Sequence, residues 1–148
     1  MKNKTLAAWL ALIGGPLGLH RFYLHGPRDA LAYVHWPFTL MGIYGLWRVQ
    51  RFGIDDTASW VLLPCFGFMS ASTALTAIVY GLARPEPWNA RFNPSLEAEA
   101  APGQTNWFTI GAVVLALMLG TTVLMSSIVY SFQRYFETQI EAGRKISQ

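Results

Sequence analysis

The sequence predicts an all-α integral membrane protein that crosses the bilayer with four transmembrane helices. Charged residues make up only 13% of the 148 residues, whereas soluble domains usually contain about 25%. Four apolar stretches alternate with polar segments, and tryptophans stand at the ends of several of them, as in the aromatic belts of membrane proteins. The formal net charge is +3 and the basic residues are scattered, so no basic surface of the kind that binds nucleic acid is evident.

The first two predicted spans cover residues 5–19 and 29–47 and form a helical hairpin within residues 1–51. The first span is short, because at ~1.5 Å per residue it reaches only ~22 Å against the ~30 Å hydrocarbon core. We therefore expect it to thin the bilayer, to lie partly inside a bundle, or to bring the hairpin into the membrane edge. Its start imitates a signal peptide, but no cleavage site follows, so we interpret it as an uncleaved span. In the second span, Pro37 predicts a kink.

The third and fourth predicted spans cover residues 60–82 and 107–132. The chain between them, residues 83–105, is expected to be an exposed linker that is partly ordered near Trp88 and Phe92 and flexible around residues 97–103. That linker contains four prolines and three glutamates, a composition typical of chain that does not enter an apolar core. We therefore divide this part of the chain into residues 52–82, which contain the third span, and residues 106–148, which contain the fourth span and a polar tail. This tail can extend the fourth helix.

Polar residues stand before both of these spans and are interpreted as helix caps. Asp55 and Asp56 are expected to cap the third helix, with Thr57 or Ser59 as alternatives for its N-cap, and Asn106 or Thr105 is expected to cap the fourth. Their side-chain oxygens can accept hydrogen bonds from the first free N–H groups.

Small residues recur every four positions in the third and fourth spans. Gly67 and Ala71 form one such pair, and Ala112, Ala116 and Gly120 form a longer ridge. Small residues let helix backbones approach closely. The sequence leaves open whether these ridges meet within one chain or between two chains.

Four crossings would place the N-terminus, the second loop and the C-terminus on one side of the membrane. That side would hold seven basic residues and the other side four. The positive-inside rule then places both termini in the cytoplasm, and we expect a bacterial cytoplasmic (inner) membrane.

The segment between the first two spans is unusual, because residues 14–26 contain four glycines, a proline, an arginine and two histidines between apolar stretches. Lipid does not tolerate irregular backbone or a guanidinium unless protein or water satisfies the polar groups. In a structural interpretation the glycines make a tight turn, the aromatic residues anchor at the interface, and Arg21 reaches lipid phosphates or pairs with Asp29. In a functional interpretation the hairpin docks a partner or a lipid headgroup, with His20 and Arg21 as contacts. The candidate site residues are Gly14, Gly15, Gly18, His20, Arg21, Phe22 and Tyr23.

The same residues resemble the TM2 domain, also called the NINE protein family in bacteria. The pattern is a lysine-led apolar helix, then Gly-Gly-x-Gly-x-His-Arg-Phe-Tyr-Leu, then a second apolar helix that ends near a tryptophan, here Trp47. The resemblance covers about a third of the chain, with two departures: His25 stands before Gly26, and Arg48 stands where the family has an aspartate. The resemblance implies a membrane accessory or signalling-related protein without an established enzymatic activity.

Three histidines raise the question of a metal or haem site. His20 and His25 are five residues apart across an expected turn, and no carboxylate stands at ligand spacing. We therefore predict no metal and no cofactor. His35 is expected to hydrogen-bond inside the bundle, to Tyr44 or to a backbone carbonyl freed by Pro37.

The sequence shows no catalytic constellation. It has no nucleophile elbow and no zinc-binding HExxH motif, and the glycines match neither nucleotide-binding fingerprint. The favoured hypothesis is a non-enzymatic membrane protein whose partners at the hairpin are the lipid bilayer and a membrane protein or a second copy. The alternative is a small oligomeric channel or transporter subunit, and a third hypothesis is a haem or metal membrane protein.

Overall fold

The computed structural model describes residues 1–146, and every regular element within them is a helix. This confirms the predicted all-α class. In chain order the elements are α1 Lys4–Ile13, η1 Gly15–Leu17, α2 Leu19–His25, α3 Ala30–Tyr33, α4 His35–Phe52, α5 Ser59–Leu82, α6 Pro85–Phe92, η2 Ala101–Gly103 and α7 Trp107–Ile146.

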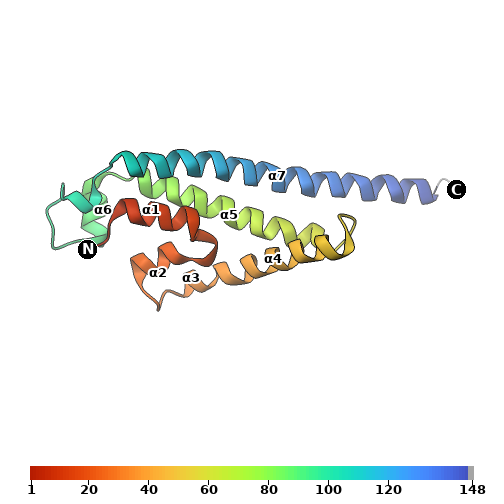
Figure 1. The fold of residues 1–148 in the computed structure, drawn as a ribbon, viewed down its shortest axis with the longest axis horizontal. Coiled ribbons are helices and arrows are strands. Elements are labelled where there is room, and N and C mark those ends of the chain that lie inside the picture. Colours follow the sequence, from red (N-terminus) through yellow and green to blue (C-terminus); the bar gives the residue numbers. More distant parts are fainter. Residues whose placement is uncertain (147–148) are drawn as a thin grey trace.

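The two longest helices, α5 and α7, lie antiparallel along most of the molecule (Figure 1). They have 24 and 40 residues, and both are apolar and long enough to cross a bilayer. Only 28% of the most apolar window of α5 and 22% of that of α7 is buried inside the chain. The core helix of a soluble domain would be mostly buried, so these helices present apolar surface outward.

The small residues of α5 and α7 pack against each other within one chain, one of the two alternatives that the sequence left open. A Cβ on Gly120 would lie 2.7 Å from the Cβ of Ala74, and one on Gly67 would lie 2.9 Å from the Cβ of Ser127. Ala112 and Ala116 are both fully buried. The two ridges therefore bring α5 and α7 of one chain into close contact.

Helix α1 does not cross the molecule, contrary to the predicted first span. Its ten residues reach ~15 Å, half of the ~30 Å hydrocarbon core. The chain then reverses, and α2 runs back toward the end where α1 began (Figure 1). The backbone N–H of Asn3 donates to the Tyr23 hydroxyl at 2.7 Å, and the Lys2 ammonium donates to the Tyr23 carbonyl. The end of α2 therefore lies beside the N-terminus.

The reversal at residues 14–18 depends on glycines and a proline. Gly18 has φ 73°, in the left-handed region that favours glycine, and a Cβ there would lie 2.5 Å from the Ala32 carbonyl oxygen. A Cβ on Gly15 would lie 2.4 Å from the Thr73 side chain of α5. Pro16 has no N–H and lies in η1, a 3-10 helix of three residues. The turn is thus packed directly against α3 and α5.

Helices α3 and α4 form the second arm of the predicted hairpin, and α4 lies beside α5. The helix is interrupted at Val34, three residues before Pro37, near the kink that the sequence predicted. Gly42 and Gly45 face α5, where added Cβ atoms would lie 2.1 Å from Phe66 and 2.7 Å from Leu62. Helix α4 contains two arginines and is not among the helices apolar enough to cross a bilayer by themselves.

The prediction of four membrane-spanning helices is therefore wrong in number. Among the described residues, only α5 and α7 meet the length and composition of a span, and α1 is a shorter apolar helix. For α1 the physical reason is the turn at residues 14–18, which ends the helix too early to cross. Helix α4 is long enough but not apolar enough to cross by itself.

The N-terminus and the C-terminal end of α7 lie at opposite ends of the molecule (Figure 1). The prediction that both termini share one side is therefore not supported, because it required α1 to cross. Moving Lys2 and Lys4 to the other end changes the predicted distribution of basic residues from seven against four to five against six. The positive-inside rule no longer favours either orientation.

The segment 83–105 is built onto the N-terminus rather than fully exposed. Trp88 of α6 is 3% exposed, and its indole N–H donates to the Lys2 carbonyl at 3.0 Å. The fully buried Lys4 donates from its ammonium to the Ala83 carbonyl at 2.9 Å and to Thr105 Oγ1 at 2.7 Å. These contacts close one end of the bundle.

An ion pair holds the turn between α4 and α5 at the opposite end. The Arg48 guanidinium donates to both carboxylate oxygens of Asp56, at 2.8 and 2.6 Å. Ala58 occupies the N-cap position of α5, but Asp56 accepts the N–H of Ser59, the first residue of the helix, at 3.0 Å and so performs the capping role that the sequence predicted. Asp55 does not cap this helix and instead accepts a hydrogen bond from Arg134 of α7 at 2.9 Å. The hydrogen bonds from Arg48 hold the pKa of Asp56 well below its usual value.

We expect Gly42→Ala to lower the melting temperature of the protein in detergent. The added methyl carbon would lie 2.1 Å from the Cβ and 2.8 Å from the backbone nitrogen of Phe66, and overpacking of this kind costs about 1–3 kcal/mol. Gly111→Ala is the matched control, because a Cβ there meets no atom within 4 Å. Equal melting temperatures for the two variants would contradict a close contact between α4 and α5.

We also expect Asp56→Asn to destabilise the protein at neutral pH and to have a diminishing effect in acid. A carboxyl group whose folded-state pKa is lowered stabilises the fold above its unfolded-state pKa, and this stabilisation is lost as pH falls. The difference in melting temperature between wild type and variant should therefore be largest above pH ~4 and shrink below it. A difference that stays constant down to pH ~2 would show that the charge of Asp56 does not matter.

Candidate functional site

The glycines of the candidate hairpin site lie inside the fold. Gly14, Gly15 and Gly18 are buried, and so is His20, which is 2% exposed. Residues Arg21, Phe22 and Tyr23 are partly exposed. Of the seven candidate residues, these last three alone reach the surface, so a partner outside the chain would meet the α2 side of the hairpin.

Arg21 is held by Asp29, one of the two alternatives that the sequence left open. The Arg21 Nε donates to Asp29 Oδ2 at 2.8 Å, and His25 Nδ1 lies 3.6 Å from the same oxygen. Asp29 also accepts the Leu31 N–H at 3.1 Å and so caps α3. The hydrogen bond from Arg21 lowers the pKa of Asp29, so the carboxylate stays ionised beside the guanidinium.

The aromatic residues of the motif pack within the chain. The ring of Phe22 lies 5.0 Å from that of Tyr33 in an edge-to-face arrangement. The Lys2 ammonium lies 5.0 Å from the Tyr23 ring centroid, in addition to the hydrogen bond from Asn3 to the Tyr23 hydroxyl. Both rings therefore fix α2 to neighbouring elements, α3 and the N-terminus.

His20 and His35 come together in the structure, which their sequence spacing did not indicate. Their ring centroids lie 5.4 Å apart, and the ring of Tyr80 lies 6.0 Å from that of His20. The buried Nδ1 of His20 has no hydrogen-bond partner among the described residues. His35 Nδ1 lies 2.9 Å from the Leu31 carbonyl oxygen, so it bonds to a backbone carbonyl, but not to Tyr44. No group of three or more potential metal ligands occurs within residues 1–146.

The sequence did not reveal that Arg48 and Asp56 form a second ion pair like that of Arg21 and Asp29. In both pairs the aspartate follows the arginine by eight residues and accepts a hydrogen bond from the N–H of the next helix. The shared spacing is the signal that could have identified them. Arg48, which stands where the related domains have an aspartate, thus takes its own acidic partner from the following turn.

A third charged cluster lies where α7 passes the α4–α5 turn. Arg134 is 6% exposed and donates to Asp55 at 2.9 Å and to Glu137 at 2.7 Å. The cluster ties the C-terminal part of α7 to the turn, and its charges are paired.

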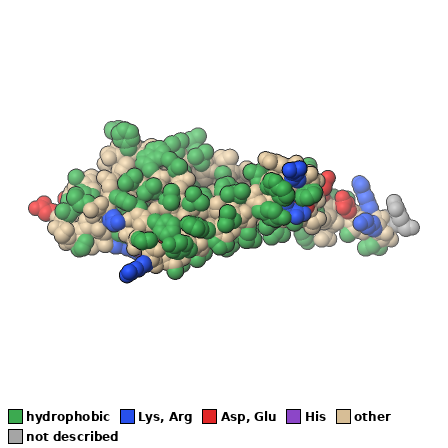
Figure 2. All heavy atoms as spheres, turned by 60° about the horizontal axis from the view of Figure 1, so that its bottom comes forward, with side chains coloured by type: hydrophobic (Ala, Val, Ile, Leu, Met, Phe, Trp, Pro, Cys, Tyr) green, Lys and Arg blue, Asp and Glu red, His purple; other side chains and the backbone are tan. Residues whose placement is uncertain are grey.

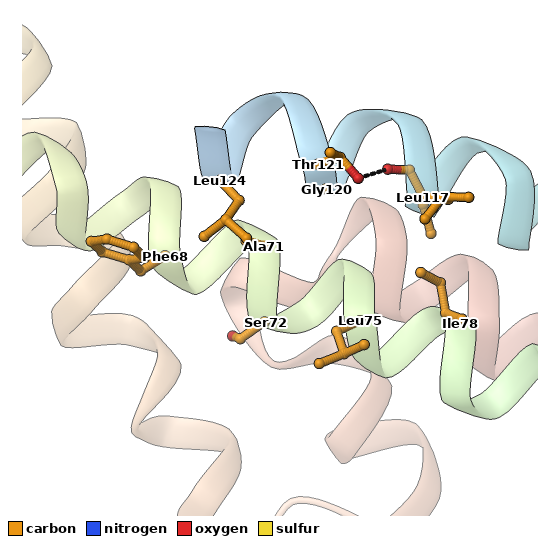
Figure 3. A pocket seen from close by; sticks show the side chains of 10 residues that line it. Phe68, Ala71, Ser72, Leu75, Ile78, Leu117, Gly120, Thr121 and Leu124 are labelled. Carbon is orange, nitrogen blue, oxygen red and sulfur yellow. Dashed lines mark hydrogen bonds between the residues drawn. The ribbon is translucent and has the colours of Figure 1, made fainter. Parts of the chain in front are cut away.

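An apolar groove runs between α5 and α7 (Figure 3). Phe68, Ala71 and Leu75 line one wall, and Leu117 and Leu124 line the other. Its polar side chains already make hydrogen bonds within their own helices, because Ser72 donates to the Met69 carbonyl and Thr121 donates to the Leu117 carbonyl. The groove offers lipid-like surface but no free polar group to select a ligand.

Comparison with known proteins places the family resemblance on residues 1–55. The model of the TM2 domain matches this range, which covers α1 to α4 and the turn that follows. No curated protein and no solved structure matches the chain. With the two long apolar helices, this match indicates a membrane protein. Residues 1–55 of this chain match the TM2 domain, and a pair of long apolar helices follows them in the sequence.

Proposed function

We propose that this chain is a non-enzymatic, multi-pass protein of a bacterial cytoplasmic membrane that acts through contacts at the α2 side of its hairpin. The proposal rests on the distribution of hydrophobic and charged side chains over the molecular surface. Hydrophobic side chains cover the middle of the face seen in Figure 2, and basic and acidic side chains gather toward the two ends. A belt of this kind matches the hydrocarbon region, with the charged ends in the headgroup regions or in water.

In the proposed arrangement α5 and α7 cross the bilayer, and α3 with α4 crosses beside them. Helix α4 is not apolar enough to cross by itself, but its glycines pack against α5 and its Arg48 is paired at the membrane end. Helices α1 and α2 form a re-entrant hairpin, whose turn at residues 14–18 lies at membrane depth. Irregular backbone is tolerated there because protein surrounds it.

The N-terminal end of the bundle is the favoured contact surface. Of the three guanidinium nitrogens of Arg21, only Nε donates a hydrogen bond to the Asp29 carboxylate. The two terminal nitrogens make no hydrogen bond within the described residues. The Arg21 side chain is 24% exposed. Arg21 is therefore anchored and still able to bind an external acceptor.

The channel alternative receives less support. The small-residue ridges that a helical oligomer would need are occupied by the contact between α5 and α7 of the same chain. We therefore keep the contact protein as the proposed function.

Cysteine labelling from one side of the membrane tests the proposed crossing pattern. The single native cysteine, Cys65, would be replaced by serine, and single cysteines would be placed at Asn3, Ile54, Glu97 and Gly143. We expect Asn3 and Glu97 to react with an impermeant maleimide from one side, and Ile54 and Gly143 from the other. If the chain crossed the membrane four times, only the cysteine at Asn3 would change sides, and it would react together with those at Ile54 and Gly143.

A pair of arginine variants tests the contact surface. We expect Arg21→Gln to reduce the amount of lipid or protein that copurifies in mild detergent, whereas Arg48→Gln leaves it unchanged. The control is matched because Arg48 forms the corresponding ion pair at the opposite end. Mass spectrometry of the purified samples measures the copurified molecules, and thermal melting checks the fold. Equal losses from both variants would mean that Arg21 acts only through folding.

A further inference from the structure

A cavity of about 290 Å³ lies at the N-terminal end of the bundle, between α2, α5 and α6. Arg21 and His25 reach it from α2, Tyr80 from α5, and Trp88 and Arg91 from α6. It joins the TM2 domain to the part of the chain that lies outside it.

Two guanidinium groups line this cavity, and neither is neutralised in full. Arg91 has no carboxylate within 4.0 Å among the described residues, and its guanidinium lies 5.2 Å from the centroid of the Phe92 ring. Arg21 shares its charge with Asp29 but keeps its terminal nitrogens open. The Tyr80 hydroxyl also makes no hydrogen bond within residues 1–146. The cavity therefore offers several unused donors together with a surplus of positive charge.

The remaining walls of the cavity are apolar or aromatic. Trp88 is 3% exposed and its indole N–H is already bonded to the Lys2 carbonyl. Val79 of α5 also lines the cavity and is 59% exposed, on a helix whose apolar surface continues toward the centre of the bundle. A ligand that suits both walls carries an anionic group and an apolar part.

We propose that this cavity binds the phosphate headgroup of an anionic phospholipid, with Arg21 and Arg91 as its ligands and the acyl chains along α5. Two arginines on different elements suit a phosphate, because each guanidinium can donate two parallel hydrogen bonds to its oxygens. The proposal names the contact of the proposed function and rests on it, because the cavity must lie at the headgroup level. A headgroup seated here would join α2 to α6.

Native mass spectrometry of the delipidated full chain tests the proposal, with phosphatidylglycerol and phosphatidylcholine of identical acyl chains as probes. We expect wild type to prefer phosphatidylglycerol, and Arg91→Gln to weaken its binding about tenfold, the effect of losing one charge-assisted contact. Arg84→Gln is the matched control, because Arg84 also belongs to the α6 segment but does not line the cavity. Arg91→Lys, which keeps the charge, should retain part of the affinity.

Four outcomes would overturn the proposal. The first is equal binding of the two lipids by wild type, and the second is an equal loss in the Arg91→Gln and Arg84→Gln variants. The third is binding of inorganic phosphate as tight as that of the lipid, which would assign the cavity to a free phosphate. An acidic protein that copurifies with wild type and is lost with Arg91→Gln, without lipid preference, would assign it to a protein instead. Each of these results leaves the labelling pattern of the membrane crossings unchanged, so the two proposals fail separately.

Discussion

The reversal of the chain at residues 14–18 is the constraint on which the rest of the structure depends. Gly18 adopts a left-handed conformation and Gly15 meets Thr73 without room for a side chain. Because α1 ends at Ile13, the chain turns back instead of crossing the molecule, and the turn packs against α3 and α5. The N-terminus then lies next to α6, and Lys2 and Lys4 supply the contacts that order this end of the bundle.

Polar contacts at the two ends of the molecule fix the turns that the reversal creates. Arg21 with Asp29 holds the turn before α3, and Arg48 with Asp56 holds the turn after α4. Each aspartate is also a helix cap, so the loss of its charge would remove an ion pair and a cap together. Between these ends the contacts are made by alanines and glycines, including Ala11, Ala74 and Ala116 where α1, α5 and α7 meet. Small residues allow this packing without large interior side chains.

The sequence predicted the helical class, the match to the TM2 domain, a cap at Asn106 or Thr105 and the close contacts of the small residues, because these follow from local pattern and composition. Asn106 does accept the Thr109 N–H at 2.9 Å. The sequence could not distinguish a short helix that crosses from one that turns back, since apolar composition is the same in both. The length of ~22 Å for the first span was the available warning. Asp55 was misassigned because its partner, Arg134, is 79 residues away and comes near only through the packing of α7.

The central claim is that α1 and α2 form a re-entrant hairpin whose two ends lie on one side of the membrane. A distance measurement by pulsed electron paramagnetic resonance tests it most directly, with spin labels at Asn3→Cys and Arg28→Cys in a Cys65→Ser background. The account predicts a separation well below the ~30 Å thickness of the hydrocarbon core, because Asn3 bonds to Tyr23 near the end of α2. A separation equal to or greater than this thickness would show that the first helix crosses the membrane and would contradict the account.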